Sequence, residues 1–223
     1  MEPKRNRQTA ITEKLEDYLY ANFTVEDELL KNIAENCWKE AGIPQINITS
    51  YQANFLHFLV KSINAKNILE IGTLAGYSSI VLARAAGTNS KVLTIEKETT
   101  HAEYARKSIE KANLSKNIEV VTSNAMDFIK NFAPENQLDL IFLDADKSNY
   151  YKYLVALTPY LRQGGLLVAD NAFAFGFLLD TAPERNPKEV KSMLGFHKQL
   201  LQRTDYFTTL VPIGDGMLVS TKL

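Results

Sequence analysis

From residue 66 onward, short apolar runs alternate with segments in which apolar residues recur every three to four positions. The short runs are apolar at nearly every position, which is typical of strands buried on both faces of a sheet. The alternation predicts an α/β fold, with a doubly wound, mostly parallel sheet and helices on both faces. We expect strands at 67–71, 91–96, 118–123, 138–144 and 166–170, and helices at 76–86, 99–113, 124–132 and 148–161.

The N-terminal part of the chain has helical periodicity only. It predicts helices at 11–21, 25–41 and 50–63, before any strand. Residues 1–10 are polar and basic, and we expect them to be mobile. We therefore expect a single domain over 1–223, in which N-terminal helices (11–63) precede an α/β core (64–223).

The C-terminal part has a different pattern from the core. Two strand-like segments, 206–213 and 217–223, flank the sequence Gly214-Asp215-Gly216, which predicts an antiparallel hairpin that closes the sheet. Residues 172–186 form the one long irregular stretch, directly after Asn171.

Composition narrows the class of protein. The chain has 223 residues, 45% of them hydrophobic, which fits one α/β domain with a substantial core. The net charge of −1 provides no overall basic field for nucleic acid. The single cysteine, Cys37, excludes an internal disulfide, and we expect it to pack in the core. Because we find neither an apolar run of ~18 residues nor a secretory signal, we expect a cytoplasmic protein with no membrane contact.

Polar side chains follow two apolar strands at the point where each strand ends. Asp144 closes one run, and Asp170 and Asn171 close another. Their oxygens could form a cage for Mg²⁺, Mn²⁺ or Ca²⁺, with the amine of Lys147 beside it. The alternative is that each Asp only caps the helix after its strand, but the pair of strand ends favours a site.

The first two strands also end in candidate ligand-binding residues. Glu70 to Ser78 reads EIGTLAGYS, in which Gly72 and Gly76 permit a tight turn and a close approach to a ligand. The second strand ends at Glu96, whose carboxylate could accept the hydroxyls of a ribose. The alternative for the glycines is an ordinary tight loop, which the acid at the tip of the next strand disfavours. An acid at this place also occurs in NAD-binding proteins. The spacing lacks the third glycine of the dinucleotide motif.

Taken together, EIGTLAGYS, the Glu96 strand end, LDADKSNY, ADN and the terminal PIGDGM resemble the metal-dependent class I methyltransferases. More narrowly, they resemble the catechol and caffeoyl-CoA O-methyltransferase family, which uses S-adenosylmethionine. The resemblance runs from about residue 45 to the end. It implies a Rossmann-like, seven-stranded sheet with an antiparallel last strand, and a homodimer built partly by the N-terminal helices.

The resemblance also implies roles for individual residues. The cofactor-binding positions are Glu70, Gly72, Ser78, Glu96, Ala125 and Asp144. The metal ligands are Asp144, Asp170 and Asn171, with Mg²⁺ as the expected ion, and Lys147 matches the catalytic lysine. The chain departs from the family at Ala174, where we expect an aromatic residue, and at His197, where Asn is frequent; Phe173, Phe175 and Phe177 could supply an apolar wall instead.

The resulting prediction is an O-methyltransferase that methylates one hydroxyl of a small ortho-dihydroxy aromatic of catechol, caffeoyl or flavonoid type. One alternative is methylation of a hydroxylated tRNA uridine by the same groups, helped by Lys4, Arg5 and Arg7. Two further alternatives are a nucleotide-binding dehydrogenase and a scaffold that binds a nucleoside without catalysis. The missing glycine disfavours the dehydrogenase, and the complete set of metal ligands and lysine disfavours the scaffold.

Overall fold

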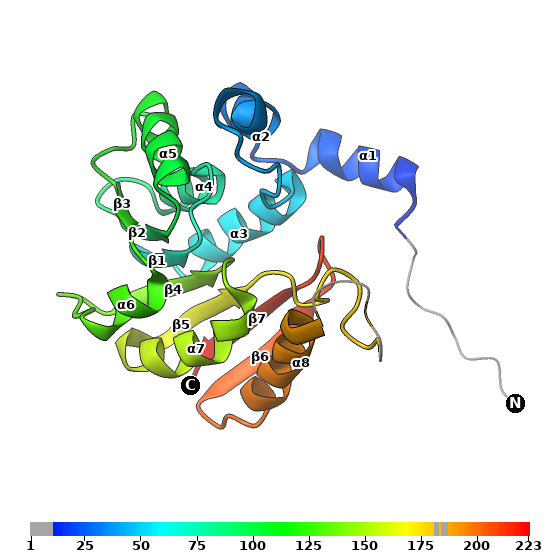
Figure 1. Ribbon diagram of the computed structural model, residues 1–223, viewed down its shortest axis with the longest axis vertical. Helices are drawn as coiled ribbons and strands as arrows, with labels where there is room; N and C mark the ends of the chain where they lie inside the picture. Colours follow the sequence, from blue (N-terminus) through cyan, green and yellow to red (C-terminus); the bar gives the residue numbers. More distant parts are fainter. Residues whose placement is uncertain (1–10, 181–182, 184–186) are drawn as a thin grey trace, which may run out of the picture.

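The computed structural model describes residues 11–180, 183 and 187–223; residues 1–10, which we expected to be mobile, lie outside this range. It contains a seven-stranded sheet with helices on both faces (Figure 1). The elements in chain order are α1 (Glu13–Asn22), α2 (Glu28–Ala41), α3 (Ser50–Ser62), β1 (Asn67–Ile71), α4 (Tyr77–Ala86), β2 (Lys91–Glu96), α5 (Thr99–Lys111), β3 (Ile118–Thr122), α6 (Ala125–Lys130), β4 (Leu138–Leu143), η1 (Lys147–Asn149), α7 (Tyr150–Leu157), η2 (Thr158–Tyr160), β5 (Leu161–Ala169), α8 (Pro187–Leu201), β6 (Tyr206–Val211) and β7 (Met217–Lys222).

The sheet has the order β3-β2-β1-β4-β5-β7-β6. The first five strands are parallel to their neighbours, and β7 is antiparallel to both β5 and β6. The predicted parallel α/β core and the terminal antiparallel hairpin are therefore confirmed. The strand order reverses at β1: β2 and β3 lie on one side of β1, and the next strand along the chain, β4, lies on its other side. Open α/β sheets bind ligands at the carboxyl edge beside such a reversal.

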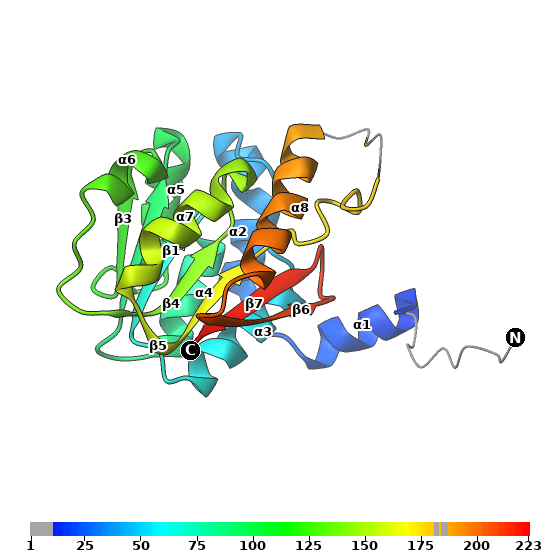
Figure 2. The same cartoon turned by 90° about the horizontal axis from the view of Figure 1, so that it is seen from below.

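Helices lie on both faces of the sheet (Figures 1 and 2), and an apolar core lies between the sheet and the helices of each face. Helices α2 to α5 cover one face, and α6, α7 and α8 cover the other. Cys37 is fully buried in the first core, as expected. The central strands β1 and β4 are mostly apolar because both of their faces are buried in this way, whereas the edge strands β3 and β6 are only partly buried.

The helical N-terminus is confirmed, and its helix starts have clear local causes. The side chain of Asp27 accepts a hydrogen bond from the Leu30 N–H at the start of α2. Thr49 and Gln52 form a reciprocal capping box at the start of α3. Helix α1, in contrast, has no buried residue and extends away from the sheet (Figure 1).

The segment that was predicted as one helix at 148–161 is instead three elements, η1, α7 and η2, and β5 begins at Leu161 rather than at residue 166. Pro159 ends the α-helix because its ring does not fit a helix interior. Gly164 adopts a φ of +70°, and a Cβ at Gly165 would lie 2.8 Å from Leu161 Cδ1, so the start of β5 needs residues that look like a loop in the sequence. Among the described residues, no helix is both long and apolar enough to cross a bilayer.

Candidate active site at the carboxyl edge of the sheet

The predicted site residues follow neighbouring strands at one edge of the sheet. Leu143 of β4 pairs with Ala169 of β5, so Asp144 and Asp170 come next on adjacent strands. The N–H of Asp144 donates to the Ile71 carbonyl at 2.9 Å, which ties the end of β4 to the end of β1. The two carboxylates are close enough for the charge of Asp144 to raise the pKa of Asp170, so the structure brings them together as predicted.

Asp144 is paired with Lys147. The Lys147 amine lies 3.0 Å from Asp144 Oδ1 and 3.0 Å from the Asp144 carbonyl oxygen. Both side chains are largely enclosed, with 14% and 19% of the Lys147 and Asp144 side chains exposed. Burial raises the pKa of Asp144, and the positive charge of Lys147 opposes this rise. The predicted proximity of the lysine to the acidic strand ends is confirmed.

Asp170 is 5% exposed, and a residue from α3 holds it. The side-chain amide of Gln52 donates to Asp170 Oδ1 at 2.6 Å. Burial and then the negative charge of Asp144 raise the pKa of Asp170 to about 7, against the effect of the Lys147 amine. A cation bound between two buried carboxylates of like charge would stabilise their ionised forms.

Asn171 follows directly and has a φ of 56°, in the left-handed region that Asn tolerates better than most residues. Its amide nitrogen donates to Asp215 Oδ2 at 3.2 Å. The three predicted ligands therefore lie at two adjacent strand ends, in a Lys–Asp–Asp–Asn group. The described residues contain no group of three or more His, Cys, Asp or Glu side chains that could hold a metal. Two carboxylates and one amide at these strand ends do not fall within that definition.

Glu70 lies on β1 with no exposed surface. Its Oε2 accepts hydrogen bonds from the Thr94 hydroxyl at 2.6 Å and from the Ser79 hydroxyl. Its Oε1 makes no hydrogen bond of good geometry, although the Ser78 hydroxyl is near enough to lower the carboxyl's pKa. Burial outweighs these hydroxyls and raises the pKa of Glu70 to about 7. A buried carboxylate with an unpaired oxygen is a candidate for binding a cationic ligand group.

Gly72 lies two residues after Glu70 and packs against the segment that follows β4. A Cβ at Gly72 would lie 2.8 Å from Ala145 Cβ and 3.0 Å from the Asp144 carbonyl carbon, and the residue has a φ of +107°. Gly76 begins α4 with a φ of +87° and lies against the backbone of Ala105. The glycines therefore permit the tight turn that was predicted, and they are packed against neighbouring protein segments; their approach to a ligand stays a prediction.

Glu96 lies at the end of β2 and is 7% exposed. Its oxygens accept the Leu74 N–H at 2.8 Å and the Glu98 N–H at 3.0 Å. His101 Nδ1 lies 3.8 Å from the same carboxylate. A carboxylate with four lone-pair positions retains capacity for ligand hydroxyls after accepting two backbone bonds.

Ala125 is the first residue of α6, directly after β3. Asn124 caps this helix by accepting hydrogen bonds from Met126 N and Asp127 N. The backbone of Ala125 is thereby fixed at the same edge of the sheet as Glu96, since Ser123 N donates to the Glu96 carbonyl at 2.8 Å.

Two residues that the sequence analysis did not identify contact the predicted ligands. Gln52 was assigned only to a helix, and Asp215 only to a turn. No local signal marks Gln52, because its contact with Asp170 spans 118 positions of the chain. Ala174, where the resemblance implied an aromatic residue, is 4% exposed, packs in the core and has a φ of 51°.

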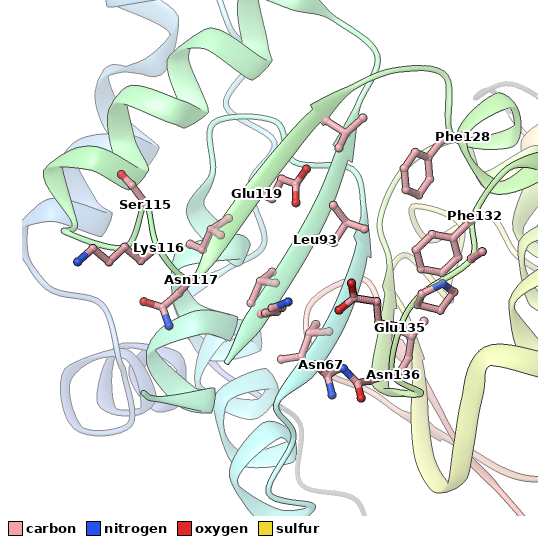
Figure 3. Close-up of a pocket in the computed structure, with 18 residues that line it drawn as sticks. Asn67, Leu93, Ser115, Lys116, Asn117, Glu119, Phe128, Phe132, Glu135 and Asn136 are labelled. Carbon is pink, nitrogen blue, oxygen red and sulfur yellow. The ribbon is translucent and has the colours of Figure 1, made fainter. Parts of the chain in front are cut away.

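A pocket of about 610 Å³ lies elsewhere, where β1 to β4 begin (Figure 3). Phe128 and Phe132 line one side of it, and Leu93 and Glu119 lie on the strands opposite. None of the predicted site residues lines this pocket. Because ligands of open α/β sheets bind outside the carboxyl ends of the strands, we assign the functional site to the edge with Asp144 and Asp170 instead.

The doubly wound sheet, its antiparallel last strands and the polar carboxyl edge define the Rossmann-like methyltransferase class. The O-methyltransferase from Bacillus cereus in complex with SAH has this fold, with a TM-score of 0.86 and 29% identity over 94% of this chain and 97% of that chain. A family model described as O-methyltransferase matches residues 21–223.

Two relatives make the assignment more specific. The catechol O-methyltransferase of Niastella koreensis is 38% identical over 191 residues, which cover 83% of this chain and 86% of that protein. The caffeoyl-CoA O-methyltransferase 2 of Petunia hybrida is 32% identical over 182 residues, covering 77% and 74%. The chain therefore belongs to the O-methyltransferase family, and the resemblance that its motifs indicated is confirmed.

Proposed function

We propose that this protein transfers a methyl group from S-adenosylmethionine to one hydroxyl of a small ortho-dihydroxy aromatic, with a bound divalent cation. The observation that carries the proposal is the group of Asp144, Asp170, Asn171 and Lys147 at two adjacent strand ends. Two relatives are named catechol O-methyltransferase and caffeoyl-CoA O-methyltransferase 2, and the acceptors in both names are hydroxylated aromatics. The tRNA and dehydrogenase alternatives gain no support from these comparisons.

The cofactor part of the proposal rests on the ends of β1 and β2. Glu70 Oε1, beside Ser78, provides a buried oxygen for a cationic ammonium group, and Glu96 provides a carboxylate for ribose hydroxyls. Ala125 lies where an adenine could be bound at the same edge. S-adenosylmethionine supplies a sulfonium methyl group when bound, and the B. cereus relative was solved with SAH, the form left after methyl donation.

The residues also fit a metal ion of the Mg²⁺ class. Burial and then the negative charge of Asp144 raise the pKa of Asp170, and a cation between the two carboxylates would stabilise their charged forms. Asn171 adds a neutral amide oxygen, and hard cations prefer such oxygen donors. A divalent cation held here would lower the pKa of a hydroxyl bound to it and fix its position.

Lys147 is the proposed base. Its amine lies 3.0 Å from Asp144 Oδ1, at the acidic strand ends. The amine can accept a proton at Nζ when it is neutral, which leaves a phenolate oxygen as the nucleophile. Methyl transfer then needs the oxygen, the methyl carbon and the sulfur in line, and fixed reactants can gain ~7–11 kcal/mol from such positioning.

The test is a panel of acceptors with radiolabelled S-adenosylmethionine and Mg²⁺. Matched pairs of 3,4-dihydroxy and 4-hydroxy aromatics separate chelating acceptors from simple phenols. We expect transfer to the dihydroxy member of each pair and little to its partner. Equal rates within the pairs would contradict the proposed substrate class, and no transfer to any hydroxyl would favour a scaffold without catalysis.

A further inference from the structure

Two of the proposed metal ligands are held by side chains from parts of the chain outside their own strands. Asp170 contacts Gln52 of α3, and Asn171 contacts Asp215 of the turn between β6 and β7. Both contacts determine how a ligand side chain is oriented. Neither residue lies at a strand end itself.

The hydrogen bonds of Gln52 fix the direction of its amide. Its Oε1 accepts from the Thr49 N–H at 3.0 Å and lies 3.1 Å from the Thr49 hydroxyl, while its Nε2 donates to Asp170 Oδ1 at 2.6 Å. A backbone N–H can only donate, so the amide oxygen must face Thr49 and the NH₂ group must face Asp170. The side chain is 3% exposed and cannot exchange these bonds for water. Gln52 therefore constrains the rotation of the Asp170 carboxylate.

The hydrogen bonds of Asp215 fix the direction of the Asn171 amide. The Asp215 carboxylate accepts from Asn171 Nδ2 at 3.2 Å, from the Phe175 N–H at 2.7 Å and from the Gly176 N–H at 3.2 Å. A carboxylate can only accept, so Asn171 must turn its NH₂ group towards Asp215 and its carbonyl oxygen away from it. The same residue thereby holds the segment after Asn171, where Phe175 has a φ of 62°.

The turn that carries Asp215 also packs against Gln52. A Cβ at Gly214 would lie 2.5 Å from Gln52 Cδ, and one at Gly216 would lie 2.9 Å from Phe173 Cδ2. Only glycine fits at these two positions without displacing the neighbouring side chain. The turn therefore holds both orienting contacts in one place.

We propose that Gln52 and Asp215 are positioning residues of the metal site, which set the directions of the Asp170 carboxylate and the Asn171 amide oxygen. This inference rests on the proposed function, because it concerns the same ligands. A purely structural role would instead affect the stability of the fold and leave the affinity for metal unchanged in the folded protein.

The test is calorimetric titration of Mn²⁺ into the full-length protein and its variants Gln52→Leu, Asp215→Ala and Asp215→Asn. Loss of groups that orient metal ligands typically costs 10–100-fold in affinity, and we expect the Kd to rise by this factor in Gln52→Leu and Asp215→Ala. Asp215→Asn should give an intermediate Kd, because one amide oxygen can still accept from Asn171 and Phe175. Asp205→Ala, on the same hairpin but paired with Arg203, is the matched control and should bind as wild type.

Circular dichroism and urea unfolding identify the variants that are folded, and only these are compared. A wild-type Kd in folded Gln52→Leu or in folded Asp215→Ala would overturn the role of that residue. If Asp215→Ala does not fold, a wild-type Kd in Asp215→Asn would overturn the role of Asp215. Asp144→Ala separates this inference from the proposed function, since wild-type Mn²⁺ binding by Asp144→Ala would mean that the metal site itself is wrong.

Discussion

Replacing Glu70 by Gln should remove a pH-dependent loss of stability from the protein without its cofactor. Glu70 has no exposed surface, and burial raises its pKa from 4.5 to about 7. Gln keeps an oxygen that can accept the hydrogen bonds of Thr94 and Ser79, and it cannot ionise. The substitution therefore removes the charge and little of the packing.

The sign of the effect follows from the direction of the pKa shift. The folded protein holds the Glu70 proton more tightly than the unfolded chain, so this group favours folding at low pH. Below pH 4.5 the carboxyl is protonated in both states, and as the pH rises through 7 the folded state must accept a buried charge. The loss reaches about 3 kcal/mol once the pH exceeds the folded pKa. Between pH 5 and pH 8, we expect about 2–3 kcal/mol of this loss.

The assay is urea unfolding of wild type and Glu70→Gln, followed by circular dichroism at several pH values from 5 to 8, in chelator and without cofactor. Titrating groups that do not interact with Glu70 contribute equally to both proteins and cancel in the difference; Asp144, whose charge also raises the pKa of Glu70, does not cancel completely. The free energy of unfolding of the variant should rise relative to wild type as the pH increases. A difference that stays constant across this range would refute the assignment of a raised pKa to Glu70.

Two further predictions concern catalysis and cofactor binding. Lys147→Met should spare cofactor binding and lower the rate of methyl transfer by ~10²–10⁴-fold. Lys147→Arg should be similarly slow, because Arg cannot deprotonate. A nearly wild-type rate in Lys147→Arg would assign Lys147 an electrostatic role. Glu96→Ala should weaken S-adenosylmethionine binding by ~1–3 kcal/mol, measured by calorimetry in EDTA, and an unchanged affinity would mean that the ribose is bound elsewhere.

The sequence was sufficient for most strands of the core because burial on both faces leaves a nearly continuous apolar run. The beginning of β5 escaped prediction because Arg162 to Gly165 combine charge, polarity and two glycines, which is typical of a loop. There the strand depends on tertiary contacts, such as the ion pair of Arg162 with Asp139 at 2.6 Å. Local patterns do not encode such contacts.

The candidate site could likewise be predicted from the sequence only in part. Asp144, Asp170 and Asn171 could be found because each follows an apolar strand, and the topology places such residues at one edge. The contacts of Gln52 and Asp215 with them join segments 118 and 44 positions apart, and no periodicity connects these. The homodimer stays a prediction. Tyr18 and Phe23 of the N-terminal region are exposed, as a surface that contacts a second copy would require.

We propose that the acidic and amide strand ends hold a cation that methyl transfer requires. The most direct measurement is the initial rate of methyl transfer to a 3,4-dihydroxy acceptor as a function of free Mg²⁺, from excess chelator upward. We expect no transfer in chelator, saturable recovery with Mg²⁺ or Mn²⁺, and no recovery in folded Asp144→Ala. Full turnover in excess chelator would contradict this proposal.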